Sequence, residues 1–283
     1  MEIDGYIIRE MIDGEVALAI EWAADEGWNP GVRDSDCFYA ADPHGFLVGI
    51  YDGLPVSSLS AVSYGSDFGF LGLFIVNPAF RGHGLGQEIF RAGLARLDGK
   101  VVGLDAVLEQ EEAYSRWGFQ RAHLNVRYQG WGGGDRPAST EVVALSNVPL
   151  DEILAYDDGL FPAARHEFVR CWISRPGSRA LAFVDGEEIL GYGVMRPCRL
   201  GYKIGPLFAD SYDVALAIFQ GLRSLVSKDE PVFLDVPLPN GSAAELASSH
   251  GMIPAFRTVR MYNGKPPEIP LDRWFGVTSF ELG

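Results

Sequence analysis

The chain has 283 residues, a formal net charge of −15 and 47% hydrophobic residues. That length suffices for one large domain or two of ordinary size, and the hydrophobic content predicts a sizeable core. The negative charge disfavours nucleic acid or an anionic membrane as the main partner, because either would require a basic patch. No apolar run approaches the roughly 18 to 20 residues that span a bilayer, and the start of the chain lacks the features of a signal peptide. We therefore expect a cytoplasmic protein.

The first half of the chain alternates between predicted strands and helices. Apolar residues with a period of two, bounded by turn residues, predict strands over 3–9, 46–51, 56–64, 68–76, 101–107 and 119–128. Apolar residues at helical spacing predict helices over 13–26, 85–97 and 109–117. Asp52-Gly53 joins two of these strands as a hairpin turn, and Asn77-Pro78 ends a third because proline cannot donate to a ladder.

The second half repeats this rhythm after a segment rich in glycine. Residues 130–137 carry five glycines and prolines in eight positions, a composition typical of a domain linker. We place a linker at 131–138, between a domain at 1–130 and a domain at 139–283. Predicted strands of the second domain are 180–184, 189–195, 202–208, 232–236, 252–262 and a closing strand at 275–282. Its predicted helices are 161–173, 212–225 and 242–249, an order that indicates an internal duplication.

Cysteine is the residue type that bears on disulfides and zinc. Cys37, Cys171 and Cys198 show no C-x-x-C spacing and no nearby histidine pair. An odd number in this pattern argues against a disulfide framework and against a zinc site. We predict three ordinary buried or half-buried thiols and no metal site.

The most informative segment is a glycine-rich turn between the strand 68–76 and the following helix. Gly82, Gly84 and Gly86 allow backbone angles that other residues rarely adopt, and they let a ligand approach the main chain closely. Free N–H groups and the positive dipole end of the helix favour an anion such as a diphosphate. No G-K-[ST] follows, and the spacing differs from a Rossmann fingerprint. We infer a phosphate-bearing cofactor of another kind.

Two segments resemble motifs of the GNAT N-acetyltransferase superfamily: Arg81-Gly82-His83-Gly84-Leu85-Gly86 and Ala113-Tyr114-Ser115-Arg116-Trp117-Gly118-Phe119. The resemblance covers about residues 1–130, and the second half resembles the additional domain of tandem members. It implies an α/β fold of two tandem GNAT-like domains, each a mixed, mostly antiparallel twisted sheet flanked by helices. The implied activity is transfer of an acetyl group from acetyl-CoA to an amine, by direct attack in a ternary complex.

The resemblance also implies which residues bind the cofactor. Main-chain groups of three strand residues would contact the pantetheine arm, and these are Phe74, Ile75 and Val76. Amides of the turn would hold the diphosphate, and these belong to Arg81, Gly82, His83, Gly84, Leu85 and Gly86. The second half has no glycine turn at the corresponding place, so we expect a degenerate copy that binds no CoA.

For catalysis the resemblance implies that Tyr114 is the general acid, which protonates the departing thiolate. The stabilising donor for the tetrahedral oxyanion would be a backbone N–H of the strand that ends at Val76. The general base is less determined: Asp67, Asp105 and Glu109 are candidates, and Glu109 heads the helix that carries Tyr114.

We therefore predict an acetyl-CoA-dependent N-acetyltransferase that acts on a primary amine of a small molecule. One alternative is a non-catalytic, acyl-CoA-binding regulatory module. Another is an aminoacyl- or peptidyl-transferase that uses charged tRNA, which the net charge of −15 disfavours. The predicted partners are acetyl-CoA and a small amine, with no nucleic acid and no membrane, and a homodimer is left open.

Overall fold

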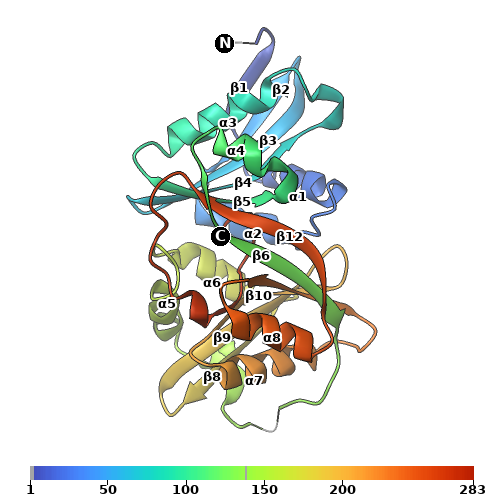
Figure 1. Cartoon of the computed structure of the whole chain (residues 1–283), viewed down its shortest axis with the longest axis vertical. Coiled ribbons are helices and arrows are strands. Elements are labelled where there is room, and N and C mark those ends of the chain that lie inside the picture. The colour runs from blue at the N-terminus through green and yellow to red at the C-terminus, as the bar shows by residue number, and fades with distance from the viewer. Residues whose placement is uncertain (1–2, 138) are drawn as a thin grey trace.

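The computed structural model describes residues 3–137 and 139–283, which form two lobes stacked along the long axis (Figure 1). The first lobe contains the strands β1 (Tyr6–Glu10), β2 (Phe46–Tyr51), β3 (Leu54–Tyr64), β4 (Phe68–Val76), β5 (Val101–Val107) and β6 (Gln120–Trp131). Its α-helices are α1 (Val16–Asp25), α2 (Asp34–Ala41), α3 (Leu85–Arg96) and α4 (Glu111–Ser115), with short 3-10 turns at η1 (Pro78–Phe80) and η2 (Leu108–Gln110).

The second lobe repeats the order of hairpin, strand, helix, strand, helix, strand. Its strands are β7 (Val142–Ala144), β8 (Arg179–Asp185), β9 (Glu188–Pro197), β10 (Tyr202–Ala209), β11 (Pro231–Pro237), β12 (Ile253–Tyr262) and β13 (Trp274–Gly276). Its helices are α5 (Leu150–Asp158), α6 (His166–Ser174), α7 (Tyr212–Arg223) and α8 (Gly241–Ser249), with 3-10 turns η3 (Leu145–Asn147) and η4 (Leu271–Arg273). The predicted duplication agrees with this order.

One sheet of 13 strands runs through both lobes, in the order β1-β2-β3-β4-β5-β12-β6-β11-β10-β9-β8-β7, with β13 paired to β10. Only two neighbouring pairs along this order, β4 with β5 and β10 with β11, are parallel. The mixed, mostly antiparallel sheet flanked by helices is therefore confirmed. The two domains do not, however, keep separate sheets.

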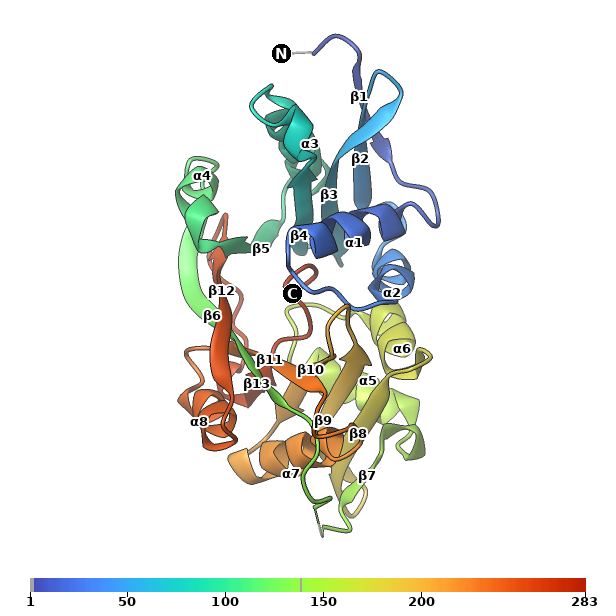
Figure 2. The ribbon, with the colours of Figure 1, turned by 90° about the vertical axis from the view of Figure 1, so that its right-hand side faces the viewer.

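The lobes exchange their last strands. β12 of the second half lies between β5 and β6, and β6 of the first half lies between β12 and β11. Figure 2 shows these two strands side by side, crossing from one lobe to the other. Pro254 of β12, which cannot donate to a ladder, lies where the register with β6 shifts. The domain limits at 1–130 and 139–283 stay a prediction, and residue 138 of the linker lies outside the described residues.

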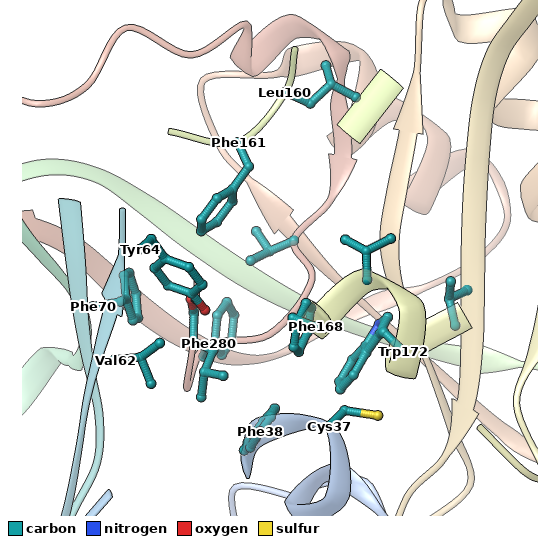
Figure 3. Packing of buried hydrophobic residues seen from close by; sticks show 14 of the residues in the cluster. Cys37, Phe38, Val62, Tyr64, Phe70, Leu160, Phe161, Phe168, Trp172 and Phe280 are labelled. Carbon is teal, nitrogen blue, oxygen red and sulfur yellow. The ribbon is translucent and has the colours of Figure 1, made fainter. Parts of the chain in front are cut away.

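An aromatic cluster joins the lobes (Figure 3). Phe38 of α2 stacks on Trp172 of α6 with ring centroids 6.0 Å apart. Tyr64 of β3 and Phe161, which precedes α6, form a T-shaped pair with ring centroids 5.0 Å apart. Burial of each large apolar side chain contributes about 1.5–3 kcal/mol. The two halves are thus packed together through a continuous core.

Buried charges also cross between the lobes. Asp34 of α2 pairs with Arg175 at 2.7 Å and with Arg196 of β9 at 3.1 Å. Arg127 of β6 forms two hydrogen bonds to Asp235 of β11, at 2.6 and 2.8 Å. Removal of either carboxylate would leave a buried guanidinium without its partner, which is strongly destabilising.

The prediction of three free thiols is wrong for two of the cysteines. Cys37 of α2 and Cys171 of α6 form a disulfide, with Cα atoms 5.3 Å apart. The two residues are 134 positions apart in the chain, so their proximity follows from the packing of the lobes and leaves no spacing signal. Cys198 is a buried free thiol, as predicted.

The predicted elements otherwise differ from the structure in few places. The closing strand 275–282 is wrong: only Trp274–Gly276 is a strand, and residues 277–283 form turns that are buried between the lobes. The helices α2 and α5 and the strand β7 were not predicted. Helix 161–173 begins later, at His166.

Candidate functional site

A gap opens between the parallel strands β4 and β5. They pair from Phe68 to Leu71 on β4 and from Val101 to Leu104 on β5, although β4 continues to Val76 and β5 to Val107. At Leu73 the backbone has a φ of 46°, and the register between β3 and β4 shifts there. This bulge bends the last part of β4 away from β5. The edge of β4 beyond the bulge is consequently unpaired.

Main-chain groups of the predicted pantetheine-binding residues lie on both edges of β4. The N–H of Asn77 donates to Val56 of β3 at 2.8 Å. In an antiparallel ladder, successive residues direct their N–H and C=O groups to opposite sides. Phe74 and Val76 therefore direct their backbone N–H and C=O groups into the gap, whereas those of Ile75 point towards β3. Of the three, Phe74 and Val76 offer backbone donors to a ligand in the gap.

The glycine-rich loop has the geometry that its sequence predicted. Gly82 and Gly84 have φ values of 83° and 84°, which other residues rarely adopt. Gly84 is the N-cap of α3. Gly86 lies so close to β4 that an added Cβ would approach Val76 Cγ2 to 3.2 Å. Within the described chain, no acceptor lies opposite the N–H groups of residues 82–86. Several free donors therefore converge at the positive end of the helix.

The side chains of Arg81 and His83 contact other groups of the protein. Arg81 donates from Nε to the carbonyl of Val76 at 2.8 Å and forms an ion pair with Glu26 after α1. His83 is exposed, and its Nδ1 lies 3.3 Å from the carbonyl of Phe80. Arg81 thus holds the loop against the end of β4.

Two cavities meet along β4. The first, of about 600 Å³, lies over the glycine-rich loop and reaches Arg116 and Trp117; we call it the loop cavity. The second, of about 480 Å³, lies between the lobes and is called the central cavity. Both are lined by Phe74, Val76, Arg81, Phe90, Gln110 and Tyr114. A ligand bound along the loop can therefore reach a molecule bound in the centre.

Tyr114 lies on α4 where the two cavities meet. Its half-buried ring packs against Phe90 at 5.6 Å and Phe74 at 6.4 Å. The hydroxyl has no hydrogen-bond partner among the residues described. Burial raises the pKa of Tyr114 well above its ordinary value, so its phenol remains protonated at neutral pH. A protonated, unpartnered hydroxyl is available to a ligand at this junction.

The three carboxylates considered as bases lie in different surroundings. Glu109 is exposed in η2 and lines the central cavity. Asp105 lines the same cavity but accepts two hydrogen bonds from Arg260, at 2.8 and 2.7 Å, and one from Asn125. Asp67 lies at the opposite end of β4 and lines neither cavity. The fold thus brings Glu109 and Asp105 to the site and leaves Asp67 outside.

Residues of the exchanged strands and of the C-terminal turns complete the central cavity, and sequence reasoning missed them. Arg127 of β6 and Thr258 of β12 line it because the lobes exchange these strands. Phe280 and Glu281 line it from the turns after β13. The alternation of apolar and polar residues over 275–282 predicted a strand, and nothing in that pattern indicated that Glu281 belongs to a site.

The corresponding gap in the second lobe is filled by the protein itself. β10 and β11 pair only from Tyr202 to Ile204. Beyond this point β13 pairs with β10 at Leu207 and Phe208, and the N–H of Val277 donates to Asp235 of β11 at 2.7 Å. The loop before α7 has a Ser211 cap and no glycine turn. This lobe therefore has no open edge where a second extended ligand could pair.

In the part of the chain that the structure describes, no group of three or more His, Cys, Asp or Glu side chains could hold a metal ion. None of the helices in this part has the length and apolar character needed to cross a membrane.

Family models match both halves of the chain. Residues 16–119 match the acetyltransferase (GNAT) family, and residues 153–276 match an acetyltransferase (GNAT) domain. Together the matches take in both lobes, including the glycine-rich loop and Tyr114.

Relatives and solved structures agree with these matches. The holothin acyltransferase of a Pseudoalteromonas species is 29% identical over 95% of this chain and 92% of its own. A structure of a Pyrococcus horikoshii protein assigned as an acetyltransferase has 25% identity and a TM-score of 0.83, covering 100% of this chain and 98% of its own. A tandem GNAT protein from the clavulanic acid biosynthesis pathway, 14% identical, has the same fold, with a TM-score of 0.62 over 92% of this chain and 99% of its own. The chain belongs to the GNAT superfamily as a tandem member with two GNAT domains, and it is an acyltransferase.

Proposed function

We propose that the protein transfers an acetyl group from acetyl-CoA to a primary amine of a small molecule, by direct attack in a ternary complex. One observation carries the proposal: the loop cavity and the central cavity share Tyr114 and the unpaired edge of β4. A donor in one cavity and an acceptor in the other would meet at this junction. Holding two reactants in attack geometry removes much of the entropic cost of a bimolecular reaction.

The loop cavity suits the acyl donor. Free N–H groups of residues 82–86 would hold the diphosphate, and the positive φ angles of Gly82 and Gly84 support this use of the loop. The pantetheine arm would run beside β4, where Phe74 and Val76 direct main-chain groups into the gap. Its thioester would then reach the central cavity, with a β4 N–H as oxyanion donor.

Tyr114 would act as the general acid for the departing thiolate. Its hydroxyl has no competing partner in the described structure, and its raised pKa keeps the proton on the phenol at neutral pH. The sequence predicted Glu109 as the base, and this residue lies at the exposed rim of the central cavity.

The central cavity suits a small amine. Its arginines are already paired: Arg81 with Glu26 and Arg127 with Asp235. Two carboxylates of the cavity, Glu109 and Glu281, form no ion pair among the described residues. The cavity therefore has an excess of negative charge, which attracts an ammonium group. Aliphatic and aromatic side chains line much of the rest, so the acceptor would carry an apolar or flat body beside its amine.

The two domains would have different roles. Residues 1–130 would form the catalytic domain and residues 139–283 a degenerate domain, because β13 fills the gap that CoA would need in the second lobe. The proposed compartment is the cytoplasm. Disulfides such as Cys37–Cys171 are uncommon in a reducing cytosol, so the thiol state of the protein in cells tests the compartment.

The test is release of free CoA thiol across a panel of amines, with acetyl-CoA and longer acyl-CoA donors compared. Longer donors are included because the Pseudoalteromonas relative is named for acyl rather than acetyl transfer. Tyr114→Phe should lower kcat by about 10²-fold or more, the usual contribution of a general acid, with an unchanged Kd for acetyl-CoA. Thermal stabilisation by acetyl-CoA without thiol release from any amine would instead indicate a binding module.

A further inference from the structure

Glu281 is the unusual residue of the central cavity. Its side chain lines the cavity and is only 4% exposed. Its Oε2 atom is buried and has no hydrogen-bond partner among residues 3–137 and 139–283. Buried carboxylates are normally paired or hydrogen-bonded, because removal of a charge from water is costly. An unpartnered carboxylate that borders a cavity therefore points to a ligand.

The backbone on either side of Glu281 is held in place by the first lobe. Ser60 of β3 donates from Oγ to the Glu281 carbonyl at 3.4 Å, and Tyr64 donates to the Leu282 carbonyl at 3.0 Å. Gly72 of β4 packs directly on this segment, since an added Cβ would lie 2.0 Å from the Glu281 carbonyl oxygen. The Arg127 guanidinium covers the neighbouring Phe280 ring at 5.1 Å. The carboxylate thus projects from a fixed position.

Charges around Glu281 come from three strands. Arg127 of β6 pairs with Asp235, and Arg196 of β9 shares Asp34 with Arg175. Asp105 of β5, which also faces Glu281, pairs with Arg260. No cation among the described residues forms an ion pair with Glu281, so its carboxylate can accept hydrogen bonds from an amino group that enters the cavity.

We propose that Glu281 binds the amino group of the acceptor and takes its proton during acyl transfer; this rests on the function proposed above. The bound ammonium gives one proton to the Glu281 carboxylate, which frees the nitrogen lone pair to form a C–N bond to the thioester carbon. The C–S bond breaks with its electron pair on sulfur, which takes the proton of Tyr114, and the second proton lost from nitrogen returns to the Tyr114 oxygen. The products are an amide and the free thiol of CoA.

The other carboxylates fit this role less well. Asp105 is engaged by Arg260 and Asn125, so its oxygens are already accepting hydrogen bonds. Glu109 is exposed, where water competes for an ammonium group and weakens the interaction. Glu281 alone combines burial with an unpartnered oxygen at the cavity. The same segment thus fills the gap of the second lobe through β13 and supplies a catalytic group to the first.

The experiment compares Glu281→Gln with Glu109→Gln, using an amine that the wild-type protein acetylates. Glu187→Gln, on the exposed β8–β9 turn, controls for the loss of one negative charge. For Glu281→Gln we expect kcat to fall about 10²- to 10³-fold at pH 7, as for loss of a general base. Its Kd for acetyl-CoA should change less than about twofold, because the donor lies in the other cavity.

A pH profile separates proton transfer from a structural role. In Glu281→Gln, kcat/KM should rise with pH as the free amine becomes available, so the deficit shrinks at high pH. Glu281→Asp, which keeps the carboxylate, should retain more activity than the glutamine variant and the wild-type profile shape. If Glu281→Gln folds poorly, this aspartate variant carries the test.

The outcomes are distinguishable. Retention of wild-type kcat by Glu281→Gln, or a loss confined to Glu109→Gln, would overturn the assignment while acyl transfer stands. A deficit in Glu281→Gln that is constant with pH would also contradict it. Absence of thiol release by the wild-type protein with any amine would count against the proposed function instead.

Discussion

Reduction of the Cys37–Cys171 disulfide should destabilise the protein markedly without changing its fold. The crosslink joins α2 to α6 across a sequence separation of 134 residues. In the chain-entropy description, a closed loop of about 135 residues lowers the entropy of the unfolded chain by about 17 cal/mol/K, or about 5 kcal/mol at 25 °C. With an unfolding entropy of about 2.1 cal/mol/K per residue, the corresponding change in Tm is about 8 °C.

The assay is thermal unfolding of the oxidised protein, of the reduced protein and of a Cys37→Ala, Cys171→Ala double variant. Thiol titration of the denatured, unreduced protein should detect Cys198 alone, and reduction should expose all three cysteines. The reduced protein and the double variant should both melt earlier than the oxidised protein. Unchanged Tm after a verified rise in thiol content would refute the reasoning, and three titratable thiols before reduction would refute the disulfide.

Three further predictions follow from single residues. Gly84→Ala should lower the free energy of unfolding by about 1–2 kcal/mol, because alanine disfavours the left-handed φ of 84°, and it should weaken acetyl-CoA binding in calorimetry. The control Gly177→Ala changes a glycine with a φ of 85° far from the loop, so it should lower stability by a similar amount and leave binding intact. Asp235→Asn should lower the free energy of unfolding by about 3–5 kcal/mol, since Arg127 stays buried beside a neutral amide. Urea denaturation measures this change, and a loss below about 1 kcal/mol would contradict the reasoning. Burial alone would raise the pKa of Asp34, but two buried arginines outweigh it and hold the pKa at about 2. Against about 3.9 in the unfolded chain, the contribution of Asp34 to stability is present above about pH 4 and is lost towards pH 2. The loss of unfolding free energy between these pH values should therefore be smaller in Asp34→Asn than in the wild-type protein, as measured by urea titrations.

Local patterns in the sequence were sufficient for most of the first lobe. Strands 46–51, 68–76 and 101–107 agree with the structure residue for residue, because apolar alternation and the Pro78 stop act over short distances. The Asp52-Gly53 turn has positive φ at both residues, as a tight hairpin requires. The glycine-rich loop was predictable for the same reason, since its backbone angles depend on the glycines themselves.

Long-range pairing was beyond the reach of such patterns. The sequence pattern predicts that 119–128 and 252–262 are strands, but strand periodicity carries no information about the neighbour that a strand pairs with. Consecutive strands pair more often than not, and here β6 instead pairs with β12 and β11. The disulfide between α2 and α6 and the cavity residues of the second half likewise depend on contacts between segments far apart in the chain, so they escaped prediction.

By itself, the sequence determined a glycine-rich loop at the start of a helix, a tyrosine on the helix that follows the next strand, and a duplicated order of elements, because each depends on neighbouring residues. Only the tertiary structure decided which side chains meet in the central cavity. Glu281 lies 167 positions after Tyr114 along the chain, and it reaches the same cavity because β13 and the turns after it are packed between the lobes. Burial and charge pairing, which single out this carboxylate, are properties of the folded chain.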